Sequence, residues 1–182
     1  MTMSFKTLLA SLALACAASL AQAAEPLTTV PALDVPRYMG TWYEIAKLPN
    51  WFQRKCTSST RAQYSLQADG RVQVANSCRL ASGEFDDALG TARQIGAANS
   101  PKLKVRFAPA WLSFIPVVWG DYWVVELDDN YQWAAVSEPG RQYLWILSRS
   151  PRMEPAVYAD VLARLARKGL DLQKLELTRQ ED

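Results

Sequence analysis

The sequence predicts an all-β fold, an eight-stranded antiparallel up-and-down β-barrel with one C-terminal α-helix packed outside it. From residue 40 onward, short alternating runs are separated by turn-forming residues at nearly regular intervals, which is typical of antiparallel strands. Gly40 and Trp42 open the first run, and Arg149 closes the last. An arginine pairs well with an indole face. Contact between Trp42 and Arg149 would therefore close the sheet into a barrel.

The first 23 residues have the features of a secretory signal peptide. Lys6 gives a positive start, residues 7–20 are almost entirely apolar, and Ala21-Gln22-Ala23 is a small-x-small cleavage site. We expect residues 1–23 to be removed and residues 24–182 to form a single domain. The alternative is a lipoprotein signal at Leu14-Ala15-Cys16, in which the Cys16 thiol is acylated and anchors the protein to a membrane.

Cleavage leaves 159 of the 182 residues, enough for one domain with a sizeable core. Without Lys6 the chain keeps 19 Lys and Arg against 18 Asp and Glu, a net charge of +1. This balance argues against nucleic acid as a partner. No remaining apolar stretch is long enough to span a bilayer as a helix.

Turn-forming residues mark where one predicted strand ends and the next begins. Asp69-Gly70 is a strong hairpin signal between the second and third runs, and Asp128-Asp129-Asn130 separates the sixth and seventh. We read the Asp and Asn cluster as a turn and expect no metal site. The eight predicted strands are Gly40–Leu48, Thr57–Gln67, Arg71–Leu80, Gly90–Ala97, Lys102–Phe107, Tyr122–Leu127, Gln132–Ser137 and Tyr143–Arg149.

After the last strand, the spacing of apolar residues changes from every second residue to the three- and four-residue spacing of a helix. Tyr158, Val161, Leu162 and Leu165 recur at helical spacing, and Gly169 is a suitable C-cap. One helix is therefore expected outside the barrel, followed by a short strand or an extended tail.

Alternation within the strands predicts which side chains face inward. If Trp42 points into the barrel, Glu44 does so too, because side chains repeat every two residues. Inward aromatic residues either line a cavity or simply fill the core, and we favour a cavity. The predicted ligand-binding residues are Tyr64, Leu66, Val74, Tyr122, Val124, Tyr143, Trp145 and Glu44.

Strand direction separates a sealed end from an open end. Gly40, Trp42 and Arg149 lie at the end with the tight turns, and we read them as the structural base of the barrel. The opposite end receives two apolar connections, a first mouth loop around Pro49-Asn50-Trp51-Phe52 and a second from Ala108 to Gly120. Exposed apolar loops of this kind usually mark a binding surface. The predicted mouth residues are Trp51, Phe52, Trp111, Phe114 and Trp119.

An inward carboxylate at Glu44 needs a partner, because an unpaired buried charge is costly. Two interpretations are open. Glu44 either pairs with Arg149 or another polar group near the base, or it hydrogen-bonds the headgroup of a ligand.

Two cysteines, Cys56 and Cys78, remain after cleavage. In an oxidising compartment they predict a disulfide, which closes a loop of about 20 residues and contributes on the order of 3 kcal/mol. A two-residue turn at Asp69-Gly70 places Cys78 opposite Arg61, so the bridge requires the chain before Thr57 to bend back. The alternative is two buried free thiols.

Three motifs in order resemble the lipocalin family, and specifically its bacterial outer-membrane and apolipoprotein D-like branch. Gly40-Thr41-Trp42-Tyr43-Glu44-Ile45-Ala46 is similar to the first family motif, Leu127-Asp128-Asp129-Asn130-Tyr131 to the second, and Arg149 to the third. The resemblance covers residues 30–178 and implies binding or transport of a small hydrophobic ligand, a fatty acid or a lysophospholipid, without a cofactor. It implies a periplasmic protein or, through Cys16, an outer-membrane lipoprotein that serves membrane lipid storage or maintenance.

An enzymatic role is not expected. The sequence contains no histidine, which excludes histidine-based triads and histidine-ligated zinc or haem. Two alternatives to a carrier remain, namely a cysteine-dependent isomerase and an interaction module whose apolar mouth docks on a membrane or a protein. We expect a monomer or a weak homodimer.

Overall fold

The structure is a computed structural model that describes residues 25–181. The predicted signal segment, residues 1–23, and Cys16 lie outside the described residues. None of the described helices is long and apolar enough to cross a bilayer.

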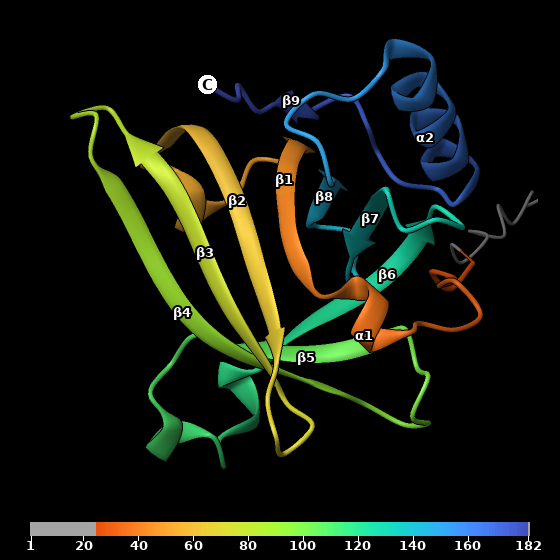
Figure 1. Ribbon diagram of the computed structural model, residues 1–182. Helices are drawn as coiled ribbons and strands as arrows, with labels where there is room; N and C mark the ends of the chain where they lie inside the picture. The colour runs from red at the N-terminus through yellow and green to blue at the C-terminus, as the bar shows by residue number, and fades with distance from the viewer. Residues whose placement is uncertain (1–24, 182) are drawn as a thin grey trace, which may run out of the picture.

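Eight consecutive strands form one antiparallel sheet that closes on itself, which confirms the predicted fold class (Figure 1). Each strand pairs with the next in sequence, and β1 pairs with both β8 and β2. The strands are β1 (Gly40–Lys47), β2 (Cys56–Leu66), β3 (Val72–Leu80), β4 (Phe85–Gln94), β5 (Lys102–Arg106), β6 (Gly120–Leu127), β7 (Trp133–Ser137) and β8 (Leu144–Ser148).

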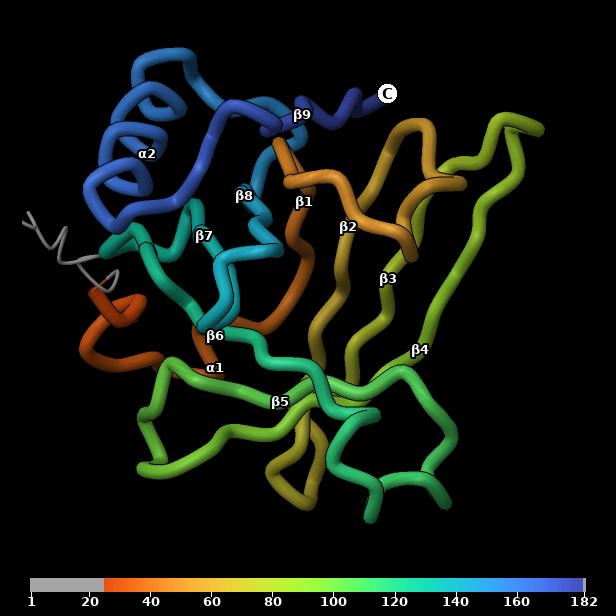
Figure 2. Tube along the Cα trace, turned by 180° about the vertical axis from the view of Figure 1, so that it is seen from behind, coloured from red at the N-terminus to blue at the C-terminus, as the bar shows by residue number. Residues whose placement is uncertain are grey.

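Helix α2 (Pro155–Arg167) packs on the outside of the barrel, as the periodicity predicts. Its Val161 and Leu165 are fully buried, in an apolar cluster shared with Val125 of β6 and Ile146 of β8. Gly169 follows the helix with a φ of +74°, the left-handed conformation suited to a C-terminal cap. Figure 2 shows the helix and the chain after it from behind, on the β6 to β8 side of the barrel.

The chain after α2 returns to the barrel and covers the edge where β1 and β2 diverge. Strand β9 (Glu176–Leu177) pairs with Ala46 and Lys47 at the upper end of β1. The paired residues of β1 and β2 run only from Gly40 to Tyr43, below this point. Gln180 Nε2 then bridges the two strands by donating to the carbonyls of Glu44 (2.7 Å) and Thr60 (2.9 Å).

The base of the barrel carries a short helix that we did not predict, α1 (Val35–Tyr38). Asp34 caps it, since its carboxylate accepts the Arg37 N–H at 3.2 Å, and Pro36 stands in its first turn. Cap residues followed by proline are a sequence signal for a helix start. A helix of four residues is too short to show a helical period, so the apolar pattern of the sequence does not reveal it.

Bulges account for most differences between the predicted and observed registers. The β1 register against β8 shifts between Glu44 and Ala46, so that Ile45 and Ala46 both join the outer cluster with α2. The inward alternation of Trp42 and Glu44 therefore does not continue to Ala46. In addition, β4 begins at Phe85 and not at Gly90, because its first half is largely exposed and lacks the alternation that marks a half-buried strand.

Candidate ligand cavity

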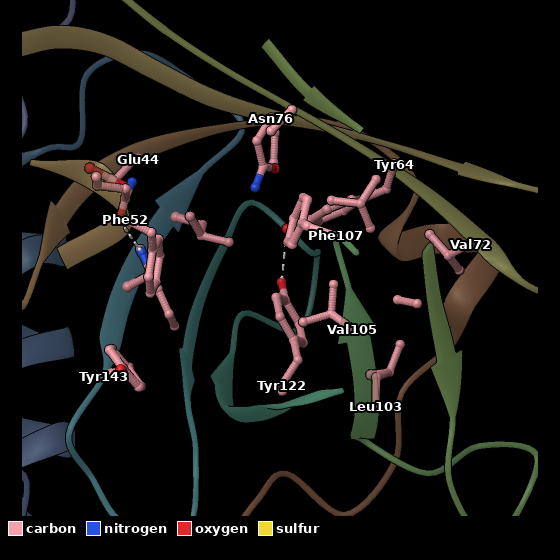
Figure 3. A pocket seen from close by; sticks show the side chains of 18 of the residues that line it. Glu44, Phe52, Tyr64, Val72, Asn76, Leu103, Val105, Phe107, Tyr122 and Tyr143 are labelled. Carbon is pink, nitrogen blue, oxygen red and sulfur yellow. Dashed lines mark hydrogen bonds between the residues drawn. The ribbon is translucent and has the colours of Figure 1, made fainter. Parts of the chain in front are cut away.

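The barrel encloses a cavity of about 820 Å³ (Figure 3). Its wall is mostly apolar and is built by inward residues of β2 to β6 and β8, among them Ala62, Val74, Leu103 and Leu147. Tyr38 and Leu33 close it at the base, while residues of the loops at Trp51 and Trp119 line the other end. A cavity of this size and character accommodates a small hydrophobic molecule.

Six of the eight predicted ligand-binding residues line this cavity, and two do not. The lining residues are Glu44, Tyr64, Val74, Tyr122, Tyr143 and Trp145. Leu66 lies outside it and is 46% exposed, because the β2 to β3 hairpin extends past the base of the barrel. Val124 faces inward but is fully buried in the core cluster with Trp42 below the cavity.

The two loops of the predicted mouth make different contributions. Trp51 and Phe52 line the cavity, and the Phe52 ring lies 6.2 Å from that of Trp145. In the second loop Val117, Val118 and Trp119 line it, and Trp119 is held by its Nε1–H donating to the Ser113 carbonyl at 2.8 Å. Trp111 and Phe114 point away into solvent, with 72% and 77% of their surfaces exposed. They lie on the mouth loop but outside the cavity.

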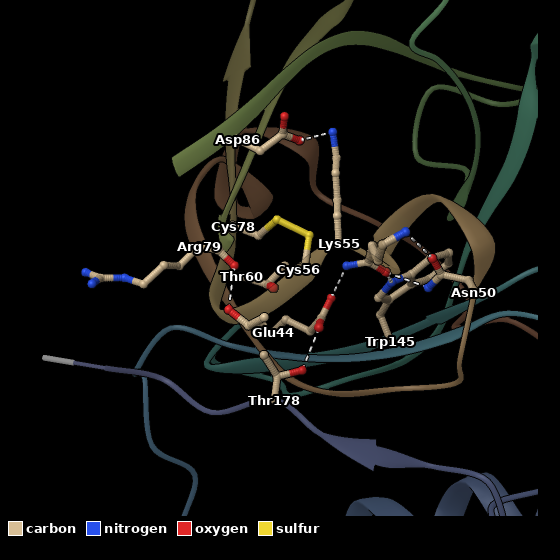
Figure 4. Close-up of a disulfide and its surroundings, with 12 residues drawn as sticks. Glu44, Asn50, Lys55, Cys56, Thr60, Cys78, Arg79, Asp86, Trp145 and Thr178 are labelled. Carbon is tan, nitrogen blue, oxygen red and sulfur yellow. Dashed lines mark hydrogen bonds and ion pairs between the residues drawn. A yellow bond between two sulfur atoms is a disulfide. The ribbon is translucent and has the colours of Figure 1, made fainter. Parts of the chain in front are cut away.

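Glu44 lies in the cavity wall inside a hydrogen-bonded network and does not pair with Arg149 (Figure 4). Its carboxylate accepts Gln53 Nε2 at 2.7 Å and Thr178 Oγ1 at 2.6 Å. The Gln53 carbonyl oxygen in turn accepts Trp145 Nε1 at 3.0 Å. Burial raises the pKa of Glu44, although both hydrogen bonds oppose the shift. The network ties the cavity wall to the first mouth loop and to the C-terminal segment.

The predicted disulfide between Cys56 and Cys78 is present, with a Cα–Cα distance of 5.5 Å. A bulge in β2 brings the two residues together: Arg61 pairs with Ser77, but the register shifts between Arg61 and Ser58. Ser59 at this point adopts a φ of +54°. The chain therefore bends before it reaches Thr57, and the expectation that Arg61 faces Cys78 is off by one residue.

Three tyrosine hydroxyls meet in the lower part of the cavity. Tyr122 Oη lies 2.9 Å from Tyr38 Oη and 3.1 Å from Tyr64 Oη, and all three residues line the cavity. Burial raises the pKa of each phenol, to about 12 for Tyr64. The hydroxyls therefore stay protonated and remain hydrogen-bond donors at physiological pH. Tyr38 was missed in the sequence because it belongs to α1.

Two kinds of catalytic group, a free thiol and a metal-binding cluster, are absent from the described residues. Both cysteines among them are joined in the disulfide, which leaves no thiolate there for a cysteine-dependent isomerase. No group of three or more carboxylates and cysteines in residues 25–181 is arranged to hold a metal ion.

The fold and the cavity define a class of protein: a closed up-and-down β-barrel, sealed at one end, that binds a small hydrophobic molecule inside. Within this class the chain belongs to the lipocalin family, since the model for the lipocalin-like domain matches residues 33–180. Lipocalins are in general binding and transport proteins.

The chain is similar to lipocalins of plants, bacteria and animals. It is 42% identical over 158 residues to temperature-induced lipocalin-1 of Arabidopsis thaliana, covering 86% of this chain and 84% of that protein. It is 39% identical over 149 residues to the outer membrane lipoprotein Blc of Escherichia coli K12, covering 81% and 80%. Apolipoprotein D of Mus musculus is 29% identical over 153 residues, covering 81% and 77%.

Solved structures share the fold at lower sequence identity. Insecticyanin from the tobacco hornworm Manduca sexta superimposes with a TM-score of 0.67 at 22% identity, covering 86% of this chain and 85% of that one.

Proposed function

We propose that this lipocalin carries a single-chain lipid, a fatty acid or a lysophospholipid, in the storage or maintenance of membrane lipid. The observation that supports this most directly is the 820 Å³ cavity with its mostly apolar wall. An alkyl chain placed there would exchange water for apolar contacts, which is favourable by about 0.8 kcal/mol per buried CH₂ group. The similarity to Blc, an outer membrane lipoprotein by name, supports a role at a membrane.

The residues proposed to contact the lipid are those that line the cavity on opposite walls. Tyr64 and Val74 lie on the β2 and β3 side, Tyr122 on β6, and Tyr143 and Trp145 at the β8 side below the mouth. The stacked rings of Tyr143 and Trp145, with centroids 5.9 Å apart, offer a flat apolar surface to a chain that passes from mouth to base.

We propose that the protein reaches the periplasm through its signal segment and is released by cleavage after residue 23. The alternative is an outer-membrane lipoprotein anchored through Cys16, as the name of Blc suggests for that relative. Mass spectrometry of the mature N-terminus distinguishes the two, because an acylated Cys16 adds the mass of its lipid and moves the N-terminus to residue 16.

We further propose that the mouth loop touches the membrane surface from which the lipid is taken. The exposed Trp111 and Phe114 form its outer side, and aromatic side chains are favoured at the interface between water and lipid. A variant carrying Trp111→Ser and Phe114→Ser should bind vesicles less while still binding lysophospholipid from solution. A second role for these residues is a weak homodimer, which sedimentation at increasing protein concentration would show.

Lipid binding is tested by titrating the purified barrel with a long-chain fatty acid and with a lysophospholipid. Trp145 and Trp119 line the cavity, so the intrinsic fluorescence should change until one lipid is bound per barrel. Native mass spectrometry should show the same single lipid in protein purified from its own cells. A barrel that takes up neither lipid in both measurements would contradict the proposed function.

A matched pair of variants on β3 locates the bound lipid. Val74 lines the cavity and its neighbour Gln73 is exposed on the outer face. Val74→Trp should reduce lipid affinity at least tenfold by filling the cavity, whereas Gln73→Trp should leave the affinity unchanged. Equal affinities of the two variants would place the lipid elsewhere.

A further inference from the structure

The three tyrosine hydroxyls in the cavity have one more proton than their own hydrogen bonds use. Each phenol donates one hydrogen bond, and the cluster contains two bonds, Tyr38 to Tyr122 and Tyr64 to Tyr122. However the donors are assigned, one O–H is left without an acceptor inside the cluster. Tyr122 occupies the central position, so it can accept from both neighbours and direct its own proton into the cavity.

A hydroxyl that accepts two hydrogen bonds becomes a stronger donor, because neighbouring hydrogen bonds polarise one another. Figure 3 shows the Tyr64 and Tyr122 side chains approaching each other across the cavity, within the apolar wall formed by Val72, Leu103 and Val105. A hydrogen-bond acceptor that enters the cavity can thus accept the Tyr122 O–H group. Because the surroundings are apolar, leaving that O–H group without a hydrogen bond costs free energy.

A second polar atom without a partner lies in the cavity wall above the cluster. The Asn76 side-chain oxygen is buried, and no donor among residues 25–181 reaches it. Asn76 lines the cavity two residues above Val74, the residue paired with Tyr64, which places it about 7 Å nearer the mouth. A plain hydrocarbon chain would leave the surplus tyrosine proton below it unsatisfied.

The cluster is better suited to a neutral oxygen than to an anion. A buried carboxylate stays charged only where donors or a cation offset its loss of hydration, and the cluster supplies a single donor. The nearby cation, Arg149, is committed elsewhere: its guanidinium stacks on Trp42 and donates to the carbonyls of Arg37, Thr41 and Tyr131. It adds positive charge behind the cluster but directs its N–H groups away from it.

We infer that Tyr38, Tyr64 and Tyr122 form a polar subsite that receives one uncharged carbonyl oxygen at the inner end of the ligand. The ligand class is a long apolar molecule that carries a ketone, an aldehyde, an ester or a protonated carboxyl group at the end that enters first. This inference rests on the proposed function and adds the orientation of the ligand, with its carbonyl group at the base and its chain toward the mouth.

Infrared spectroscopy of a bound carbonyl tests the subsite directly. The probe is a long-chain methyl ketone with an isotopic label at its carbonyl carbon, because a hydrogen bond lowers the stretching frequency of a carbonyl group. In the wild-type barrel the labelled band should lie well below its position in an alkane solvent. A bound fatty acid should show the band of a protonated carboxyl group.

Three isosteric changes remove the subsite while keeping its shape. In the variant Tyr38→Phe, Tyr64→Phe and Tyr122→Phe, the carbonyl band should return to its position in alkane. The affinity ratio of the ketone to an alkane of equal length should fall by about three- to tenfold relative to the wild type, the range expected for one hydrogen bond. Tyr158→Phe, which removes a tyrosine hydroxyl on α2 outside the cavity, should change neither quantity.

The wild-type spectrum alone can overturn the inference, even if the triple variant fails to fold. A ketone that binds with an unshifted carbonyl band, or a fatty acid that binds only as carboxylate, would contradict the subsite and leave the carrier function intact. A band that is shifted equally in the wild type and the triple variant would also contradict it. Failure of the ketone, the fatty acid and the lysophospholipid to bind at all would instead contradict the proposed function.

Discussion

The guanidinium carbon of Arg149 lies 3.9 Å from the centroid of the Trp42 indole, and this contact joins the last strand to the first. Trp42 is fully buried. The ring of Tyr38 also packs against Trp42, with centroids 4.9 Å apart and ring planes tilted by 34°. The base of the barrel is therefore a cluster of Arg149, Trp42 and Tyr38, and Tyr38 also belongs to the tyrosine cluster of the cavity. The group of residues that seals the base of the barrel therefore also forms the floor of the cavity, through Tyr38.

Arg149→Lys should destabilise the barrel although it keeps the charge. Arg149 donates to three backbone carbonyls at 2.9 to 3.2 Å while it stacks on Trp42, and an ammonium group cannot reproduce that planar geometry. We expect the free energy of unfolding in urea to fall by about 2–4 kcal/mol. Arg167→Lys on the exposed face of α2 is the control and should have almost no effect. A similar small loss in both variants would show that the stack is unimportant.

Gly40→Ala should destabilise the protein for two separate reasons. Gly40 has a φ of +95°, and a Cβ atom there would lie 3.2 Å from Arg149 Nη1. We expect a loss of about 1–3 kcal/mol in thermal or urea unfolding. Gly70→Ala is a matched control, since Gly70 has a φ of +78° but open space around it. If both variants lose the same stability, backbone strain alone explains the effect and the contact with Arg149 contributes nothing.

Glu44→Gln should remove a pH dependence of stability. Burial raises the folded-state pKa of Glu44 above its ordinary value of 4.5, so the folded protein binds this proton more tightly than the unfolded chain does. Its contribution to the free energy of unfolding therefore falls as the pH rises from about 4.5 through the folded-state pKa. Urea unfolding at several pH values between 4 and 7 should show this decline in the wild type but not in the variant. Parallel curves would mean that the carboxyl group has an unshifted pKa.

Replacing both bridged cysteines, Cys56→Ala with Cys78→Ala, should lower the free energy of unfolding by about 3 kcal/mol. The bridge closes a loop with a sequence separation of 22 and pins the bulged start of β2 to β3. Reduction of the wild type should cause the same loss. A change below about 1 kcal/mol would indicate that the bulge at Ser59 is held by other contacts, such as its N–H bond to the Arg179 carbonyl.

Two tryptophans of the mouth loop should respond differently to substitution by serine. Trp119 packs against the guanidinium groups of Arg93 and Arg106 at 4.5 and 5.2 Å and lines the cavity, so Trp119→Ser should cost about 1–3 kcal/mol. Trp111 is 72% exposed, and Trp111→Ser should change stability by less than about 0.5 kcal/mol. Calorimetric melting of both variants checks the pair, and a large loss for Trp111→Ser would show that the loop packs more tightly than described.

Strand number and strand order could be predicted because they follow from the local alternation of apolar residues and from the turn residues between strands. Closure of the barrel could be predicted from the pairing of Trp42 with Arg149. The alternation from Tyr43 to Leu147 is imposed by a sheet with one face buried. Predictions of inward orientation agree with the structure where strands stay inside the barrel, as for Tyr64 and Trp145, whose contact with a ligand stays a prediction. They were wrong at Leu66, where the strand continues beyond the barrel into solvent.

The sequence by itself determined that this chain is a lipocalin barrel with a sealed base and an inward face of aromatic residues. The tertiary structure decided what those residues do together. Tyr38, on a helix with no periodic signal, joins Tyr64 and Tyr122 only after three distant segments have closed around the cavity. Bulges likewise decide the partners of Glu44 and Cys56. Local alternation follows from the strand itself, whereas bulges and long-range hydrogen bonds follow from how the sheet must twist to close.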